Sequence, residues 1–180
     1  MIFSLLVFII IIFDNNVLHP KAFTILITCF IFSNLLPIIT LLFLQKKGVI
    51  SDLDASIREE RIMPLFLGVV FAIFGYLLLH IQEAGMLVKG LMFCTITNTL
   101  VIIIITRYWK ISIHTMGVSG LLSILWIHSK EYLFIMFIIL FFVAYSRVIL
   151  KAHNIPQVTT GSLLGLILTL IQIHFLFVQI

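Results

Sequence analysis

The sequence predicts an all-α fold, a polytopic transmembrane helix bundle with six or seven spans. Three observations predict it. Of the 180 residues, 62% are hydrophobic and only 10% are charged. An ordinary soluble domain carries about 25% charged residues, so most of the outer surface of this chain must face lipid. The mean hydropathy is +1.28, and the apolar residues gather in runs of about 20, the length of a transmembrane helix.

Five apolar runs are long enough to cross a bilayer. They cover residues 22–45, 64–80, 86–106, 132–150 and 156–178. Pro37 in the first run predicts a kink there. A shorter run, residues 114–127, is rich in Gly and Ser, which predicts close packing inside the bundle. Residues 1–13 have no basic leader and no small-residue cleavage site, so we expect a short or truncated first helix there rather than a signal peptide.

No charged or Pro-rich linker divides these runs, so we expect one integral membrane domain over residues 1–180. The net charge is +4 and the 11 Lys and Arg residues are dispersed, which favours contact with lipid headgroups rather than nucleic acid. We expect a multi-pass location in the cell (inner) membrane. Cys29 and Cys94 lie in apolar runs without a CxxC pair, and no cluster has metal-ligand spacing, so we expect neither disulfide, metal nor cofactor.

Three polar joints connect the apolar runs and contain most of the residues able to do chemistry. They cover residues 46–61, 107–114 and 146–157. Two predicted spans separate the first joint from the second, and two more separate the second from the third. An even number of crossings returns the chain to the same side, so we expect the three joints to converge at one membrane face.

The third joint contains Arg147 and His153, six residues apart. A charged residue at the end of a spanning helix is costly and suggests a functional site. The two side chains do not share a helical face, but they can meet if the helix ends near His153, and Asn154 and Pro156 favour a turn there. For this joint alone, an arginine that extends to the interface and a histidine that caps a helix explain the pattern equally well.

The second joint contains Ser112 as a predicted helix N-cap, with His114 in the following turn. The N–H groups of that turn could bind an anion, although a capped helix with an interfacial histidine explains the same residues. In the first joint, Arg58 and Arg61 are three residues apart and would share one face of a helix. The alternative there is an interfacial helix over residues 52–61 whose charges are only solvated.

Together the joints supply arginines, a lysine and a helix N-terminus, which are the groups that hold a phosphoryl group in proteins. Two histidines add a nucleophile and a proton donor. In the third joint Ser146 and Arg147 are followed, after five residues, by His153, with Gln157 four residues later. This order resembles the type 2 phosphatidic acid phosphatase superfamily, a family of helical membrane proteins related to the vanadium haloperoxidases. Its third element reads Ser-Arg-x5-His-x3-Asp, so Gln157 stands where the family has aspartate.

The first two joints match the family in part. The second family element, Pro-Ser-Gly-His, is represented by Ser112 and His114 at the right spacing, with isoleucine in place of the proline and the glycine. In the first, Lys-x6-Arg-Pro, Arg61 can stand for the arginine. Asp54 occupies the position of the lysine, and Arg58 can supply the missing cation. The resemblance implies a phosphatase-like core over about residues 46–178.

The resemblance implies a metal-independent hydrolase of a phosphorylated lipid (a phospholipid, polyprenyl diphosphate or glycolipid). His153 would attack phosphorus and form a phosphohistidine, and His114 would protonate the departing oxygen. Five residues would bind the phosphate: Arg58, Arg61, Lys110, Ser112 and Arg147. Gln157 can hydrogen-bond the nucleophilic imidazole but brings no charge, which implies slower turnover, a different activating group or a relative without catalysis.

Three other functions are alternatives to the hydrolase. The first is a catalytically weak or inactive relative that binds phosphorylated lipids through the same basic residues. A small permease would need polar residues deep within several helices, and the few present are typical of helix–helix hydrogen bonds. A prenyltransferase would need two Asp-rich magnesium motifs, and Asp52 and Asp54 offer part of only one. The hydrolase is the favoured hypothesis because both histidines keep their spacing.

Overall fold

The computed structural model describes residues 8–9, 21–128 and 130–176. All regular structure in this part of the chain is helical, which confirms the predicted all-α class. The chain forms two compact units, Met1–Tyr108 and Trp109–Ile180, and each is described by itself below. The prediction of a single domain over residues 1–180 stays a prediction.

Five helical segments in the described residues are long and apolar enough to cross a membrane. They are Ala22–Lys46, Glu59–Ile81, Met86–Thr106, Lys130–Ile149 and Ile155–Leu176. They coincide with the five long apolar runs, so the chain is a multi-pass membrane protein. The predicted six or seven spans are thus supported for five: the sixth run forms a helix of 16 residues, short for a crossing. Of the predicted first helix, all but Phe8 and Ile9 lie outside the described residues.

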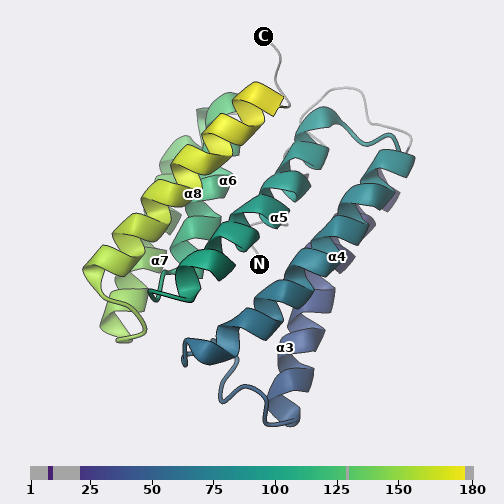
Figure 1. The fold of residues 1–180 in the computed structure, drawn as a ribbon. Helices are drawn as coiled ribbons and strands as arrows, with labels where there is room; N and C mark the ends of the chain where they lie inside the picture. The colour runs from purple at the N-terminus through teal and green to yellow at the C-terminus, as the bar shows by residue number, and fades with distance from the viewer. Residues whose placement is uncertain (1–7, 10–20, 129, 177–180) are drawn as a thin grey trace. The chain divides into compact units, whose positions relative to one another are not determined.

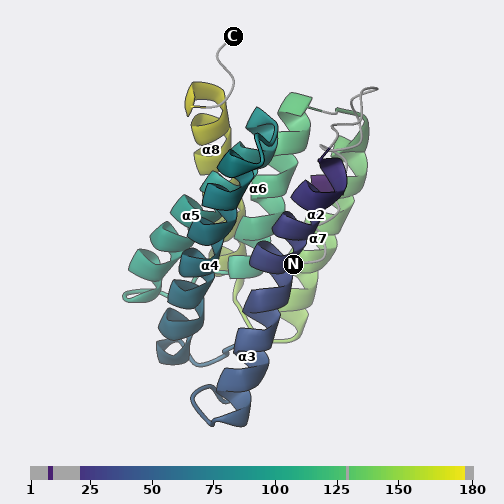
Figure 2. The ribbon, with the colours of Figure 1, turned by 90° about the vertical axis from the view of Figure 1, so that its right-hand side faces the viewer.

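The first span of the Met1–Tyr108 unit is continuous but not uniformly α-helical. α2 (Ala22–Phe30) passes through the π-helical turn η1 (Ile31–Leu35) into α3 (Leu36–Lys46), as Figure 2 shows. Pro37 explains the irregularity, because it has no N–H for the Ser33 carbonyl four residues earlier and its ring crowds that carbonyl. The wider π turn directly before Pro37 accommodates both effects.

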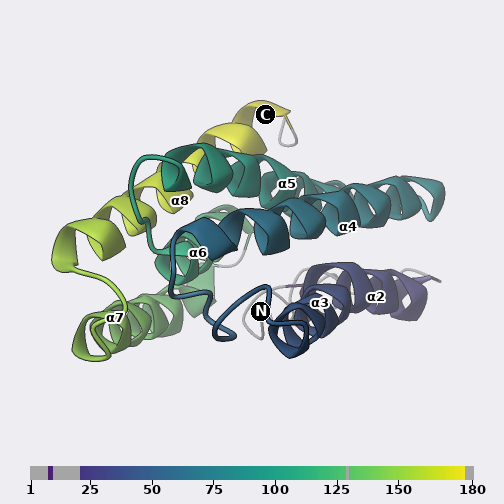
Figure 3. The same ribbon diagram turned by 60° about the horizontal axis from the view of Figure 1, so that its bottom comes forward.

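The other two spans in the described part of this unit form a helical hairpin. α4 (Ile62–Ile81) follows the short 3-10 helix η2 (Glu59–Arg61) and lies beside α5 (Met86–Thr106), and α3 packs along α4 (Figures 1 and 3). Gly75 of α4 permits this arrangement. A β-carbon there would lie 2.8 Å from Cβ of Phe32 and 3.1 Å from Cε of Met92, so a hydrogen at this position lets η1 and α5 approach α4 closely.

The Trp109–Ile180 unit is built around α6 (Ile113–His128), with η3 (Lys130–Tyr132), α7 (Leu133–Ile149) and α8 (Ile155–Leu176). α6 is largely buried and packs most extensively against α8, which confirms the interior position predicted from its small residues. α7 is mostly exposed: only 6% of the apolar stretch in the span Lys130–Ile149 is buried. Its apolar side chains therefore suit contact with lipid rather than with protein.

The contact between α6 and α8, which we call the α6–α8 seam, is held by close backbones and by hydroxyl groups. The buried side of α8 repeats every three or four residues: Val158, Gly161, Gly165, Thr169 and Ile173. Across the seam, Thr115 Oγ1 donates to the Val158 carbonyl at 3.1 Å and Ser123 Oγ donates to the Leu166 carbonyl at 2.9 Å. In a bilayer such packing and hydrogen bonding replace the hydrophobic effect as the source of helix association.

Candidate functional site

The end of α7 brings the backbones of Arg147 and His153 together. α7 ends at Ile149, and Lys151 takes a left-handed conformation with φ 53°. The Lys151 N–H then donates to the Val148 carbonyl at 3.0 Å, and the His153 N–H donates to the Arg147 carbonyl at 3.1 Å. The chain thus reverses over the last turn of α7, much as in helix C-caps that use a left-handed residue. The turn lies at Lys151, earlier than the position near Asn154 and Pro156 that the sequence predicts. A meeting of the Arg147 and His153 side chains stays a prediction.

Lys151 is the costly residue of this turn, because a side chain disfavours the left-handed region by about 1 kcal/mol. We expect Lys151→Gly to raise the free energy of unfolding by about that amount, measured by thermal unfolding of the purified protein in detergent. Leu150→Gly is the matched control, since Leu150 is exposed and has an ordinary φ of −71°; it should lower stability. Equal losses in both variants would contradict the role of the left-handed residue.

The start of α8 is closed by a reciprocal capping box formed by Asn154 and Gln157. Asn154 Oδ1 accepts from the Gln157 N–H at 3.0 Å, and Gln157 Oε1 accepts from the Asn154 N–H at 3.3 Å. Two N–H groups that the helix start leaves without partners are satisfied in this way. The sequence signal for this feature is Asn-x-x-Gln before an apolar run, and the feature is not among those predicted above. The helix begins at Ile155, one residue before the predicted start.

The capping box also fixes the tautomer of His153, whose side chain is largely buried. His153 Nδ1 lies 2.9 Å from Gln157 Oε1. The Asn154 backbone N–H is only a donor, so it requires the oxygen of the Gln157 amide, and not its NH₂ group, on this side. An oxygen can only accept, so the hydrogen must be on Nδ1 of His153. The neutral imidazole therefore carries its lone pair on Nε2.

Ser112 joins the start of α6 to this group. It is the N-cap of α6, as predicted, because its Oγ accepts from the Thr115 N–H at 3.5 Å. Its own N–H donates to the Gln157 carbonyl at 3.3 Å, and the residue is fully buried. Hydrogen bonds thus run from Ser112 through Gln157 to His153 and Arg147. The structure brings these four predicted site residues together within one unit.

The other predicted residues of this unit lie at the start of α6. Lys110 is half-buried and precedes the helix, whereas His114 is exposed in its first turn. Arg147 lies in the last turn of α7, and its Nε atom is buried. The predicted contacts of these three side chains with a phosphate stay predictions.

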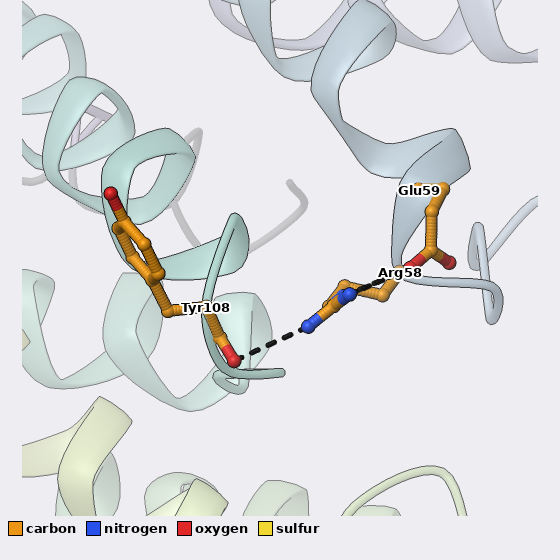
Figure 4. A network of polar contacts seen from close by, with 3 residues as sticks. All are labelled: Arg58, Glu59 and Tyr108. Atoms are coloured by element: carbon orange, nitrogen blue, oxygen red, sulfur yellow. Dashed lines mark hydrogen bonds and ion pairs between the residues drawn. The ribbon is translucent and has the colours of Figure 1, made fainter.

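Arg58 belongs to the Met1–Tyr108 unit, where it connects the first polar joint to the start of the second. Its Nη1 donates to the Tyr108 carbonyl at 3.2 Å, and its Nη2 pairs with Glu59 Oε1 at 2.8 Å (Figure 4). Inside each unit, neighbouring joints therefore lie together: Arg58 with Tyr108 in one, Ser112 with Gln157 in the other. The convergence of all three joints at one face stays a prediction.

Arg61 is 4% exposed, and its Nε donates to the Ala55 carbonyl at 2.8 Å. This contact holds a folded loop and not the alternative interfacial helix over residues 52–61, of which only η2 is helical. Ala55 has a left-handed φ of 44°, and the Asp52 carboxylate accepts from the Ser56 N–H at 3.2 Å. Side-chain bonds of this kind compete with helix formation. The predicted part of Arg58 and Arg61 in phosphate binding rests on the sequence alone.

No protein-family model, curated protein or solved structure matches this chain. The likeness to the phosphatase superfamily therefore rests on the residues of the three joints alone and stays a prediction.

Proposed function

We propose that this protein is a membrane-embedded, metal-independent phosphatase of lipid phosphates or diphosphates that acts through a phosphohistidine at His153. The observation that carries the proposal is the bond from His153 Nδ1 to Gln157 Oε1 at 2.9 Å. It orients the imidazole and leaves the lone pair on Nε2, which is the arrangement that a nucleophilic histidine requires. Arg147, whose carbonyl accepts the His153 N–H, brings a cation to the same joint.

In the proposed reaction, His153 Nε2 attacks phosphorus in line and the bond between phosphorus and the lipid oxygen breaks. His114 gives its proton to the departing oxygen, and Arg147 and Lys110 neutralise the charge on the phosphoryl oxygens. Water then gives a proton back to His114 and attacks phosphorus, the bond between phosphorus and Nε2 breaks, and phosphate and the free imidazole are released. A joint at the end of two spanning helices suits a substrate whose chains stay in the bilayer.

Gln157 orients His153 but cannot stabilise the positive charge of the phosphoimidazolium. Gln157→Glu keeps the length that the capping box needs and adds a negative charge, which a helix N-terminus favours. A charge-assisted hydrogen bond is about twice as strong as a neutral one. We therefore expect the kcat of Gln157→Glu, measured at alkaline pH, to be about tenfold higher than that of wild type. Gln157→Met, which removes the acceptor, should lower kcat. A glutamate variant no faster than the methionine variant would contradict this role.

A lipid-binding protein without catalysis is the second candidate, and one observation favours it. The capping box accounts for Gln157 by helix stability alone, so this residue would persist in a relative that has lost the reaction. The same basic residues would then hold a phosphorylated headgroup without breaking a bond.

Phosphate release by the purified protein in detergent separates the two candidates. The panel contains phosphatidic acid, phosphatidylglycerophosphate and a polyprenyl diphosphate, each with and without EDTA. The hydrolase predicts release from at least one lipid at a rate that EDTA leaves unchanged. Binding of these lipids without release would favour the second candidate, and a rate abolished by the chelator would contradict the phosphohistidine scheme.

A further inference from the structure

We infer that Asn154 is a positioning residue that sets the tautomer of His153 through Gln157. Asn154 follows His153 directly in the chain and makes both bonds of the capping box, one through its side chain and one through its backbone N–H. The tautomer itself follows from geometry that involves no substrate. Only its consequence for catalysis rests on the proposed function.

The Asn154 side chain controls where the Gln157 side chain can go. By accepting the Gln157 N–H at 3.0 Å, Oδ1 fixes the first turn of α8 against the peptide that joins His153 to Asn154. The Gln157 amide then reaches back and meets two donors, the Asn154 N–H at 3.3 Å and His153 Nδ1 at 2.9 Å. A carbonyl oxygen has two lone pairs, and both are used. The amide consequently has one favourable orientation.

This arrangement gives the chain a way to orient a histidine without an acidic residue. An aspartate at position 157 would be one methylene shorter, and glutamine or glutamate is the usual partner in a capping box. The longer side chain lets one oxygen serve the helix start and the imidazole together. Loss of the Asn154 side chain removes the bond that holds the first turn of α8 in place. Gln157 should then move away from the imidazole, although His153, Gln157 and the backbone N–H of residue 154 are all retained.

The test replaces Asn154 in the full-length protein and reads the tautomer directly. Protein labelled with ¹⁵N at histidine and held in detergent is studied by NMR at alkaline pH, where the imidazoles are neutral; His153→Ala assigns the signal. We expect wild type to show His153 with its hydrogen on Nδ1. Asn154→Ala should move the signal towards the Nε2–H form, and Asn154→Asp, which keeps the accepting oxygen, should retain the wild-type signal.

Two controls separate positioning from general loss of stability. Gly75→Ala loosens the other unit by crowding Phe32 and should leave the His153 signal unchanged. If a lipid is hydrolysed, Asn154→Ala should lower kcat about tenfold with KM unchanged, whereas Asn154→Asp should have the kcat of wild type. Hydrogen on Nε2 in wild type, or an unchanged signal in Asn154→Ala, would overturn the inference. The expected NMR result with no hydrolysis of any lipid would uphold it and count against the proposed function alone.

Discussion

His153→Ala is expected to lower phosphate release by about 10³-fold or more, the scale seen when a catalytic nucleophile is removed. The variant keeps Asn154 and Gln157, so the capping box and the start of α8 should survive. The loss then reflects the missing nucleophile and not an unfolded site. The measurement is the initial rate of phosphate release from the lipid that wild type hydrolyses best.

His174→Ala is the matched control for this variant. His174 is also on α8, but it lies exposed in the last turn with its ring against Phe175. We expect its rate to stay within about twofold of wild type, as for most exposed substitutions away from a site. A His153→Ala rate close to that of His174→Ala would rule out His153 as the nucleophile.

Gly165→Ala is expected to destabilise the Trp109–Ile180 unit by about 1–3 kcal/mol, the usual cost of overpacking a close contact. A β-carbon at Gly165 would press on the Met116 carbonyl and on Ser119 Oγ. The carbonyl belongs to the backbone of α6, so the two helices must move apart. The Thr115 and Ser123 hydrogen bonds across the α6–α8 seam would lengthen with them.

Gly117→Ala provides the control, because Gly117 is a glycine of α6 with open space where a β-carbon would be. Alanine is favoured over glycine within a helix by about 1 kcal/mol, so this variant should match or exceed wild type in stability. Both are compared by thermal unfolding in the same detergent. A Gly165→Ala protein as stable as Gly117→Ala would show that the seam is not closely packed.

Sequence alone predicted the five spans because length and apolarity decide them. The predicted run 86–106 matches its span at both ends, and the other helices agree with their runs to within two residues at the described ends, apart from the short η2 turn that extends the second span back to Glu59. A bilayer admits few other structures for such runs. The helix cap at Ser112 was also predicted, and so was a turn near His153, although it lies at Lys151 and not at Asn154. Both depend on neighbours in the chain, which is the information that a sequence carries most directly.

The features that the sequence did not predict depend on distant neighbours or on a choice between close energies. The close contacts of Gly161 and Gly165 are with Ser112 and Met116, which are more than 40 positions away along the chain. The sequence is compatible with either a helix or an irregular loop before η2. The left-handed conformation of Ala55 and the bond from the Ser56 N–H to the Asp52 carboxylate favour the loop. The sequence predicts that Gln157 can hydrogen-bond the His153 imidazole, but not that the same oxygen also accepts the Asn154 N–H.

The measurement that tests the central claim most directly is the identification of the phosphorylated residue. The purified protein is mixed with the lipid that it hydrolyses, labelled at phosphorus. The reaction is stopped in alkali, in which phosphohistidine survives, and the protein is cleaved into peptides for mass spectrometry. We predict an acid-labile phosphoryl group on His153 in wild type and none in His153→Ala. A phosphoryl group on any other residue, or hydrolysis with no phosphorylated protein at any time, would contradict the account.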